Sequence, residues 1–275
     1  MRKIFLIVII ILLTLSGCTN KTINTKGHLV IIGGGNRPDY LTKKMIELAG
    51  GNNTKFAVIP MASSVPMESA LYQKEDLVRL GVKNIEIILC DSATANTDSI
   101  LNKMNGVEAV YFTGGDQALL TKALLGTKLI EKIKEVYNNG GLVGGTSAGA
   151  AVMSKIMITG DELLSSDSTR SFYEIKKGNI KNTEGFGFVT SAIIDQHFIK
   201  RKRNNRLLTM VLENPHLLGI GIDESTAIVV KPDDTFEVLG EREVIIYDAS
   251  ESKDISVNPL GLISGSNMKM HILHI

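Results

Sequence analysis

A serine lies among small residues near the middle of the chain. The segment Gly145-Thr146-Ser147-Ala148-Gly149 follows the apolar pair Leu142-Val143 and precedes a run with helical spacing. A strand-to-helix turn of this kind can project a serine hydroxyl above a sheet, and it needs small neighbours because the backbone is crowded there. The start of the next helix offers free N–H groups to a developing oxyanion. Since glycine-rich turns often satisfy G-x-S-x-G, Ser147 is either a nucleophile or part of a tight connection.

A nucleophilic serine needs a general base, and His197 is the best-placed histidine for that role. It lies in Asp195-Gln196-His197-Phe198, directly after an expected strand at Ala192 to Ile194. That position is a strand end, as is the position of Ser147. The other histidines are more simply interpreted as structural: His28, His216, His271 and His274.

Two adjacent carboxylates, Asp223 and Glu224, are candidates for the acid that orients the base. They follow the apolar segment Gly219 to Ile222, and acids at a buried strand end need partners. From the residues alone both candidates remain open, and both could be turn residues. The sequence has no paired-histidine zinc motif, Cys–His pair or Walker loop, so we expect neither a metal nor a cofactor.

Short apolar runs alternate with helical patterns in the first half of the chain. This alternation predicts an α/β fold with a mostly parallel sheet flanked by helices. Because ligands bind beyond the carboxyl ends of such strands, the turn at Thr113 to Gln117 and the Ser147 turn are expected to meet. The expected strands are His28–Ile32, Phe56–Pro60, Ile85–Leu89, Ala109–Phe112 and Leu142–Val143, and the expected helices are Leu41–Ala49, Met67–Leu80 and Leu129–Tyr137.

The second half predicts a polar surface insertion at Thr159 to Lys177, a helix at Ile199 to Leu212 and a β-rich C-terminal part. No repeat or low-complexity segment divides it, so residues 27–275 are predicted to form one domain. The expected C-terminal strands are Leu218–Ile222, Thr226–Val230, Phe236–Leu239, Val244–Tyr247 and Met268–Ile275.

The N-terminal residues predict export. A basic start, Met1-Arg2-Lys3, precedes the apolar run Ile4 to Leu15, which is shorter than the ~20 residues that span a bilayer. Leu15-Ser16-Gly17-Cys18 resembles the lipobox of bacterial lipoproteins. We therefore expect a signal peptide at 1–17, lipidation of Cys18, a tether at 18–26, and anchoring to the outer face of the bacterial cytoplasmic membrane or an extracellular location. An ordinary signal peptide or an uncleaved anchor are the alternatives.

Charge and cysteine content narrow the possibilities further. The formal net charge is +1, which argues against a nucleic-acid surface. Cys90 is the only cysteine besides Cys18, so no internal disulfide is expected in the mature chain. A buried thiol at a strand end is the simplest interpretation of Cys90.

Several motifs together resemble peptidase family S51, which includes cyanophycinases and aspartyl dipeptidases. They are Phe112-Thr113-Gly114-Gly115-Asp116-Gln117, the Gly145–Ala150 segment, Asp195-Gln196-His197-Phe198 with Arg201, Arg203 and Arg206, and Gly221-Ile222-Asp223-Glu224. The resemblance implies a class I glutamine amidotransferase-like, or flavodoxin-like, serine peptidase domain. It implies Ser147 as nucleophile, His197 as base, Glu224 as orienting acid, and an oxyanion hole from the N–H groups of Gly115 and Ala148.

The resemblance also implies a substrate, cyanophycin, which is poly-aspartate with arginine on each β-carboxyl group. The expected products are β-Asp-Arg dipeptides. Aspartyl dipeptidase activity and a non-catalytic peptide-binding lipoprotein are the alternatives, and a homodimer is expected from the family. The stretch Met157 to Glu184 is longer than the family pattern and could reshape the mouth of the site. The residues expected to bind substrate are Gln117, Asp195, Gln196, Arg201, Arg203 and Arg206.

Overall fold

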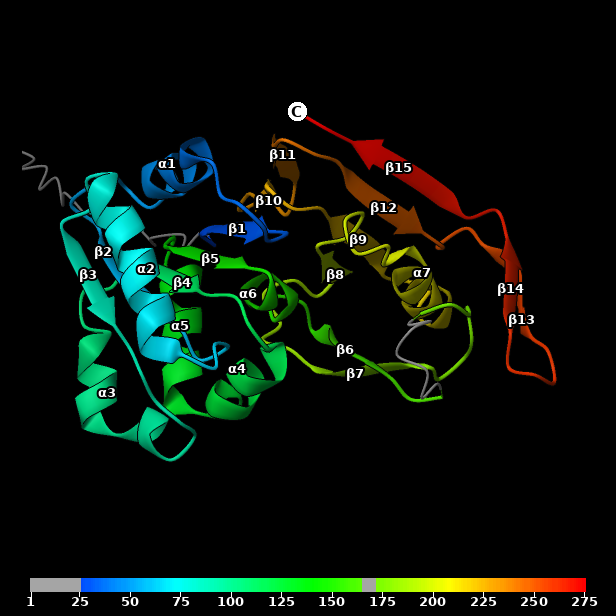
Figure 1. The fold of residues 1–275 in the computed structure, drawn as a ribbon, viewed down its shortest axis with the longest axis horizontal. Coiled ribbons are helices and arrows are strands. Elements are labelled where there is room, and N and C mark those ends of the chain that lie inside the picture. The colour runs from blue at the N-terminus through cyan, green and yellow to red at the C-terminus, as the bar shows by residue number, and fades with distance from the viewer. Residues whose placement is uncertain (1–25, 165–171) are drawn as a thin grey trace, which may run out of the picture.

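A seven-stranded sheet forms the centre of the protein in a computed structural model that describes residues 26–164 and 172–275 (Figure 1). Five strands are parallel, and two C-terminal strands join one edge in antiparallel orientation. The strands are β1 (His28–Ile32), β2 (Lys55–Ile59), β3 (Asn84–Ile87), β4 (Ala109–Phe112), β5 (Leu142–Thr146), β10 (Thr226–Val230) and β11 (Phe236–Gly240). Their order is β11-β10-β1-β5-β4-β2-β3, so β5 and its turn are central.

A second sheet has four strands in the order β15-β12-β9-β8, in which β8 and β9 are parallel. Two short antiparallel ribbons complete the strands. The predicted α/β class, with a mostly parallel sheet and a β-rich C-terminal part, is confirmed. These strands are β8 (Ala192–Gln196), β9 (Leu218–Ile222), β12 (Val244–Asp248) and β15 (Lys269–Leu273), with ribbons of β6 (Ile156–Glu162) and β7 (Ile180–Glu184), and of β13 (Lys253–Val257) and β14 (Ile263–Ser266).

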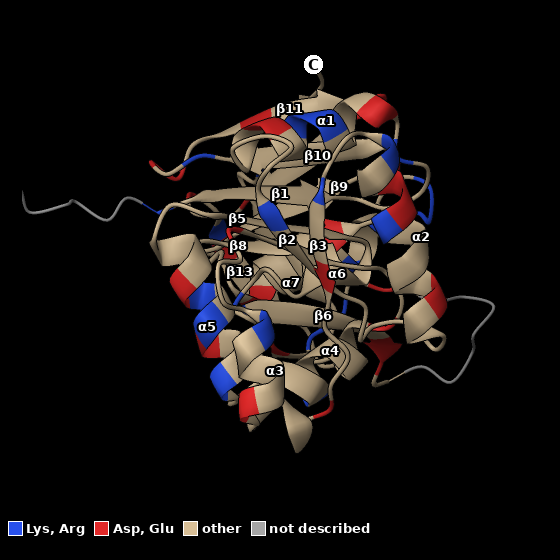
Figure 2. Ribbon diagram, turned by 90° about the vertical axis from the view of Figure 1, so that its left-hand side faces the viewer, with Lys and Arg blue, Asp and Glu red and all other residues tan. Residues whose placement is uncertain are grey.

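Helices cover both faces of the large sheet. Many Lys, Arg, Asp and Glu residues lie in these helices, whereas the central strands contain few (Figure 2). Helices α1 and α2 pack on one face, and α3 to α6 on the other. The helices are α1 (Asp39–Leu48), α2 (Pro66–Arg79), α3 (Asp98–Lys103), α4 (Gln117–Leu124), α5 (Lys128–Asn138), α6 (Ala148–Ala151) and α7 (Asn204–Glu213), with a 3₁₀ turn at Thr94–Asn96.

The two faces follow from the alternation of side chains along each strand. In β1, Val30 and Ile32 pack toward α1 and α2, whereas Leu29 and Ile31 pack in the core on the opposite face. That second core also contains Ile194 of β8 and other residues of the smaller sheet. The smaller sheet therefore packs on the α6 side, where it brings the ends of β8 and β9 near the end of β5.

The helix expected at Ile199 to Leu212 begins later than predicted, at Asn204. Residues 199–203 form a turn in which the N–H of Arg203 donates to the carbonyl of Phe198. Lys202 has φ 52°, and a right-handed helix does not continue through such a residue. Arg201 and Arg203 therefore lie on a turn, and Arg206 lies on α7.

Several short elements were not predicted from the sequence. Helices α3 and α4 have six and eight residues, too few to show a clear helical period. The insertion expected at 159–177 begins as part of β6, which pairs with β7. Residues 165–171 of that insertion lie outside the described part of the chain.

The predicted signal peptide, Cys18 and nearly all of the tether also lie outside the described residues. In the two described ranges, 26–164 and 172–275, every helix is too short or too polar to cross a membrane. Cys90 is buried and unpaired, and burial raises its pKa to about 11.

Candidate active site

Ser147 lies at the carboxyl end of β5 in a strained turn. Its φ is 53° and its ψ −110°, a conformation that non-glycine residues rarely adopt. The N–H of Ser147 donates to the carbonyl of Ile32 at 3.0 Å, which ties the turn to β1. A Cβ at position 145 would lie 2.4 Å from the carbonyl oxygen of Gly149. The small residues around Ser147 are therefore a steric requirement of the turn, as its sequence indicated.

His197 and Glu224 complete a hydrogen-bonded chain with Ser147. The distance from Ser147 Oγ to His197 Nε2 is 2.9 Å, and that from His197 Nδ1 to Glu224 Oε1 is 2.7 Å. These are the contacts that a serine–histidine–acid triad requires. The three residues come from the ends of β5, β8 and β9, and their catalytic roles stay predictions.

The structure distinguishes between the two adjacent carboxylates. Asp223 is 1% exposed, and its Oδ1 accepts from the N–H of Lys200 at 2.9 Å, whereas Glu224 Oε1 contacts His197 Nδ1. It stabilises the turn that follows His197. Glu224 is therefore the carboxylate that contacts the imidazole, a choice that the residues alone did not determine.

The glycine loop after β1 packs against both His197 and Glu224. A Cβ at Gly34 would lie 2.4 Å from His197 Cε1, and one at Gly35 would lie 2.7 Å from Glu224 Cβ. The carbonyl of Gly33 accepts from the N–H of His197 at 2.7 Å. Sequence reasoning assigned this loop no part in the site, although the run of three glycines after a buried strand was a signal of close backbone approach.

Burial and the Glu224 contact set the protonation of the site. Burial is the largest influence on His197 and lowers its pKa, while the hydrogen bond to Glu224 opposes the shift and nearby Arg201 adds to it. The hydrogen bond from His197 lowers the pKa of Glu224. Near neutral pH the imidazole is therefore uncharged and able to accept a proton, and Glu224 is ionised.

Two backbone N–H groups are available beside Ser147. A Cβ at Gly114 would lie 3.4 Å from Ser147 Cβ, so the 113–117 turn and the serine turn meet as expected. The N–H groups of Gly115 and Ala148 donate to no acceptor among the described residues. Gly115 has φ 139°, and a Cβ there would lie 2.1 Å from the carbonyl oxygen of Ala62, so only glycine fits. Both N–H groups are free to donate to an oxyanion, and their role in an oxyanion hole stays a prediction.

The predicted substrate-binding residues are not all exposed to substrate. Arg206 and Asp195 are each 1% exposed and form a buried ion pair in which Arg206 Nε donates to Asp195 Oδ2 at 2.7 Å. Gln117, 6% exposed, donates through Nε2 to the carbonyl oxygens of Ile158 and Thr159. The donors and acceptors in these contacts are therefore occupied by Asp195, Arg206 and the two backbone carbonyls. The family resemblance had implied that Asp195, Arg206 and Gln117 contact the substrate directly.

Arg203 and Arg201 extend the cationic group toward solvent. Arg203 Nη1 donates to both the carbonyl and Oε1 of Gln196 at 2.7 Å. Burial, and then the nearby charge of Arg206, lowers the pKa of Arg203 to about 10. Arg203 and Arg206 share the buried carboxylate of Asp195, and Arg201 is exposed beside them. This side of the site therefore has positive charge that an anionic ligand would stabilise.

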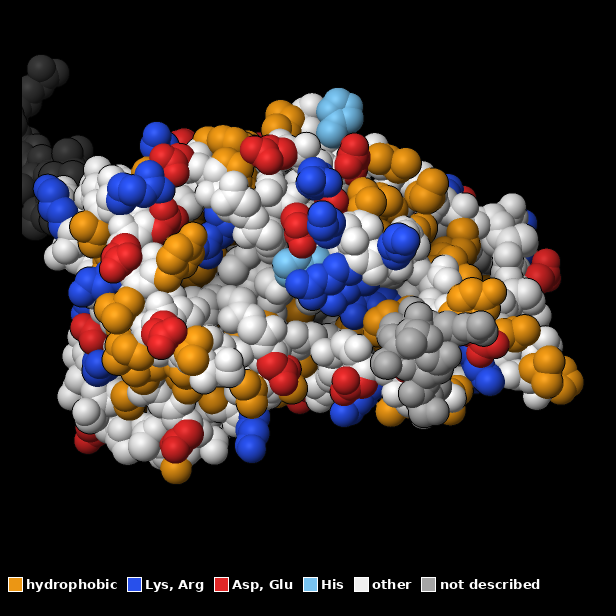
Figure 3. Space-filling view, in the orientation of Figure 1, with side chains coloured by type: hydrophobic (Ala, Val, Ile, Leu, Met, Phe, Trp, Pro, Cys, Tyr) orange, Lys and Arg blue, Asp and Glu red, His pale blue; other side chains and the backbone are white. Residues whose placement is uncertain are grey.

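The hollow beside these residues is visible from outside. Lys and Arg side chains gather next to it, and a histidine lies at its edge (Figure 3). A groove of about 620 Å³ extends from Gly115 and Asp116 along α4 to Asp161 and Lys181 of the β6–β7 ribbon. The groove adds two carboxylates and two lysines to the site, and Asp161 pairs with Lys181 at 3.0 Å. No cluster of three or more metal-binding side chains occurs in the described ranges.

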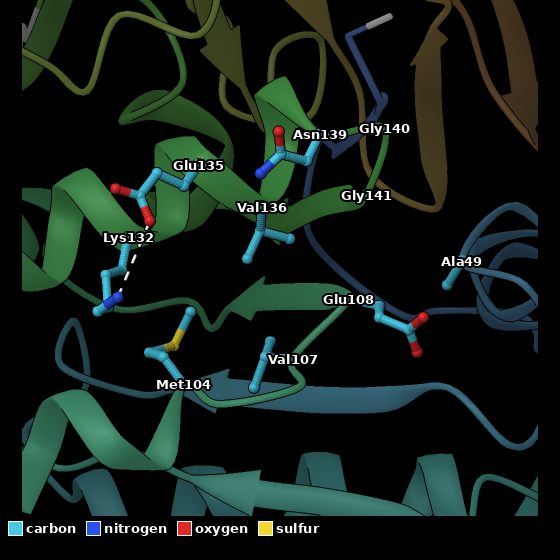
Figure 4. Close-up of a pocket in the computed structure, with 10 residues that line it drawn as sticks. All are labelled: Ala49, Met104, Val107, Glu108, Lys132, Glu135, Val136, Asn139, Gly140 and Gly141. Atoms are coloured by element: carbon cyan, nitrogen blue, oxygen red, sulfur yellow. Dashed lines mark ion pairs between the residues drawn. The ribbon is translucent and has the colours of Figure 1, made fainter. Parts of the chain in front are cut away.

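A second cavity lies at the opposite edge of the same sheet. It has a volume of about 310 Å³ and lies where β4 and β5 begin, between Val107, Glu108 and Gly141 (Figure 4). Lys132 and Glu135 of α5 form an ion pair of 3.9 Å at its wall.

Comparison with known proteins agrees with the fold and identifies the family. The family model of Peptidase family S51 matches residues 29–238. The cyanophycinase of Synechococcus elongatus is 30% identical over 270 residues, covering 94% of this chain and 80% of that protein. The cyanophycinase of Geminocystis herdmanii is 31% identical over 259 residues, with 90% and 91% covered. Peptidase E of a Nostoc species is 24% identical over 214 residues, with 78% and 84% covered.

A solved structure shares the fold. The crystal structure of a peptidase from an acI-B1 Actinobacterium has a TM-score of 0.64 and 23% identity, and the match covers 90% of this chain and 98% of that one. Fold, site and relatives together define a serine-type peptidase. The chain belongs to peptidase family S51.

Proposed function

We propose that this peptidase hydrolyses cyanophycin to β-Asp-Arg dipeptides. The observation that carries this proposal is a cationic cluster in which Arg203 and Arg206 share the single carboxylate of Asp195 and Arg201 is exposed beside them. Each β-Asp-Arg unit has free carboxylate and a guanidinium group. The turn with these arginines suits the carboxylate, and the Asp116 carboxylate at the start of the groove suits the guanidinium. Two relatives that match nearly the whole chain are named cyanophycinases.

In the proposed mechanism, Ser147 Oγ attacks the scissile carbonyl carbon while His197 Nε2 takes its proton. Glu224 orients the imidazole and stabilises the imidazolium that forms. The N–H groups of Gly115 and Ala148 stabilise the oxyanion. His197 then protonates the leaving amine, which leaves an acyl-enzyme on Ser147. A water molecule, deprotonated by His197, hydrolyses the ester and releases the second product. The contacts at 2.9 and 2.7 Å support these roles.

The proposed setting is outside the cytoplasm, with the chain tethered through a lipid on Cys18. The basic start, the apolar run and the lipobox-like residues support it. An exported enzyme of this kind would degrade polymer released by other cells into dipeptides small enough to import. Growth with labelled palmitate would test it, since label should enter the wild-type chain and be absent from Cys18→Ser.

The substrate is tested by incubating the protein with cyanophycin and with Asp-X dipeptides, each with and without a chelator. We expect β-Asp-Arg release from cyanophycin, unchanged by the chelator. Ser147→Ala should reduce kcat by about three or more orders of magnitude, because triad members act as a unit. Hydrolysis of Asp-X dipeptides alone would replace the substrate assignment with the second candidate, aspartyl dipeptidase, which the peptidase E relative favours. Full activity of Ser147→Ala would refute the mechanism.

A further inference from the structure

An arginine without a carboxylate partner lies on the other face of the large sheet. Arg37 follows the glycine loop that contacts His197 and Glu224, and it precedes α1. Its Nη1 donates to the hydroxyl of Tyr111 at 2.8 Å. Its guanidinium carbon lies 5.5 Å from the ring centroid of Tyr72 and 5.8 Å from that of Tyr111. The two rings and the hydroxyl hold the half-buried guanidinium in a fixed orientation.

The charge of Arg37 is not neutralised by any carboxylate within ion-pair distance in the described ranges. Tyr111 is the largest influence that raises the pKa of Arg37, Asp76 raises that pKa less, and Asp76 itself pairs with Arg79. The Nε and Nη2 atoms of Arg37 have no hydrogen-bond partner among the described residues. Arg79, on the same helical layer, instead contacts both Asp39 and Asp76. Arg37 is thus a fixed cation with donors left for a ligand.

The surroundings of Arg37 lead directly to the nucleophile. Tyr111 lies in β4, opposite Gly144 of β5, and is 1% exposed. Thr146, the residue before Ser147, is 8% exposed, and its Oγ1 has no hydrogen-bond partner among the described residues. Burial is the largest influence on Tyr111 and raises its pKa, whereas Arg37, and to a smaller extent Thr146, lower it. Tyr111 therefore contacts the guanidinium of Arg37 and is influenced by the hydroxyl of Thr146, the residue before Ser147.

We infer that Arg37 binds a carboxylate of the substrate on the α1–α2 side of Ser147. Guanidinium donors match a carboxylate in geometry and charge, and aromatic stacking fixes the fork before the ligand arrives. Arg201 and Arg203 lie on the opposite side of Ser147, beyond β8. The cleft then has cations on both sides of the nucleophile. This suits the C-terminal β-Asp-Arg unit of the polymer, in which both the aspartyl α-carboxylate and the arginyl carboxylate are free. The inference rests on the proposed function for the identity of the ligand.

Binding to the inactive Ser147→Ala protein tests the inference by calorimetry. The probes are β-Asp-Arg and its two mono-amides, in which either the aspartyl α-carboxylate or the arginyl carboxylate is an amide. Arg37→Ala should weaken β-Asp-Arg binding about 10- to 100-fold, the range for a hydrogen bond to a charged group. In the Ser147→Ala protein that keeps Arg37, one of the two mono-amides should bind as weakly as β-Asp-Arg binds to the Arg37→Ala variant. The affinity for that mono-amide should not fall further when Arg37→Ala is added. That mono-amide identifies the carboxylate.

Matched variants separate a ligand contact from a structural role. Arg37→Lys keeps the charge but not the fork, so its loss should be intermediate. Tyr111→Phe removes the hydroxyl that orients Arg37 and should weaken binding by a smaller factor than Arg37→Ala. Arg79→Ala removes a charge that two acids already neutralise, and should leave affinity within about twofold.

Two results would overturn the inference. One is that Arg37→Ala weakens the binding of β-Asp-Arg and of both mono-amides by the same factor. The other is that β-Asp-Arg does not bind to the Ser147→Ala protein that keeps Arg37. Hydrolysis of cyanophycin by the protein with Ser147 intact is measured separately. Turnover without a carboxylate-selective effect of Arg37 refutes the inference alone. Selective binding without turnover refutes the proposed function alone.

Discussion

The two edges of the large sheet each have a cavity, and they differ in strain and charge. At the carboxyl edge, the left-handed residues include Ser147, His197 and Ser225, which cost about 1–3 kcal/mol each. At the amino edge, the left-handed residue of the cavity is Gly140, where φ 90° causes no such strain.

Charge separates the two edges in the same way. The amino-edge ion pair, Lys132 with Glu135, joins side chains that are 41% and 65% exposed. The carboxyl edge buries the pair of Asp195 and Arg206 completely and keeps Arg203 and Arg37 without a full complement of acids. The comparison teaches that a cavity indicates a site when it contains backbone strain and charge that the protein itself does not satisfy.

The largest effect is expected from breaking the buried pair at the carboxyl edge. Asp195→Asn leaves Arg206 buried without a counter-charge, which should lower the free energy of unfolding by about 3–5 kcal/mol. Asp161→Asn breaks the exposed contact to Lys181 and should cost about 0–1 kcal/mol. Urea denaturation of both variants measures the difference. Equal losses would show that burial of the first pair is energetically unimportant.

The glycine that contacts the base should have the next largest effect. Gly34 has φ 107°, and a Cβ there would contact the His197 ring, whereas Gly51 has φ 98° and open space around it. Gly34→Ala and Gly51→Ala therefore share the cost of a left-handed alanine, about 1 kcal/mol. Only Gly34→Ala displaces the imidazole, which should reduce kcat/KM about 100-fold.

Thermal unfolding of the two glycine variants measures the cost of the left-handed alanine, and steady-state kinetics measures the effect of displacing the His197 imidazole. A similar fall in kcat/KM for both would mean that strain at the loop, rather than contact with His197, limits activity. The comparison would then no longer connect the glycine loop with the chemistry of the carboxyl edge.

A smaller effect is expected in the pH profile. Only uncharged His197 accepts a proton, so kcat/KM should rise with pH to a plateau. Because burial lowers the pKa of His197, the midpoint of this rise should lie below the ordinary value of 6.5. Arg201 contributes to that lowering, so Arg201→Gln should move the midpoint upward by less than about one pH unit. Arg242→Gln is the control, since Arg242 lies 3.8 Å from Asp223 and does not contribute to the shift. A midpoint above 6.5 in the unsubstituted protein would contradict the assignment.

Local sequence patterns predicted the strand ends of this site but not the contacts across it. The apolar runs before Ser147 and His197 placed both at strand ends, because buried strands have a strong local signature. The choice of Glu224 over Asp223 depends on which carboxylate faces the imidazole, and the family resemblance, not the residues, indicated it. Arg37 and Gly34 were missed because their partners, Tyr111 and His197, lie far along the chain. The lipid anchor stays a prediction.

The smallest effect is expected at the amino edge. Lys132→Ala breaks an exposed i,i+3 pair on α5, worth a few tenths of a kcal/mol at most, and leaves the cavity wall formed by Val107 and Gly141. Because β5 separates that cavity from Ser147 by its full length, kcat/KM should stay within about twofold of the unsubstituted protein. The measurement is a parallel assay of Lys132→Ala and Arg203→Ala. A larger loss for Lys132→Ala than for Arg203→Ala would mean that the amino-edge cavity communicates with catalysis, and the contrast between the two edges would fail.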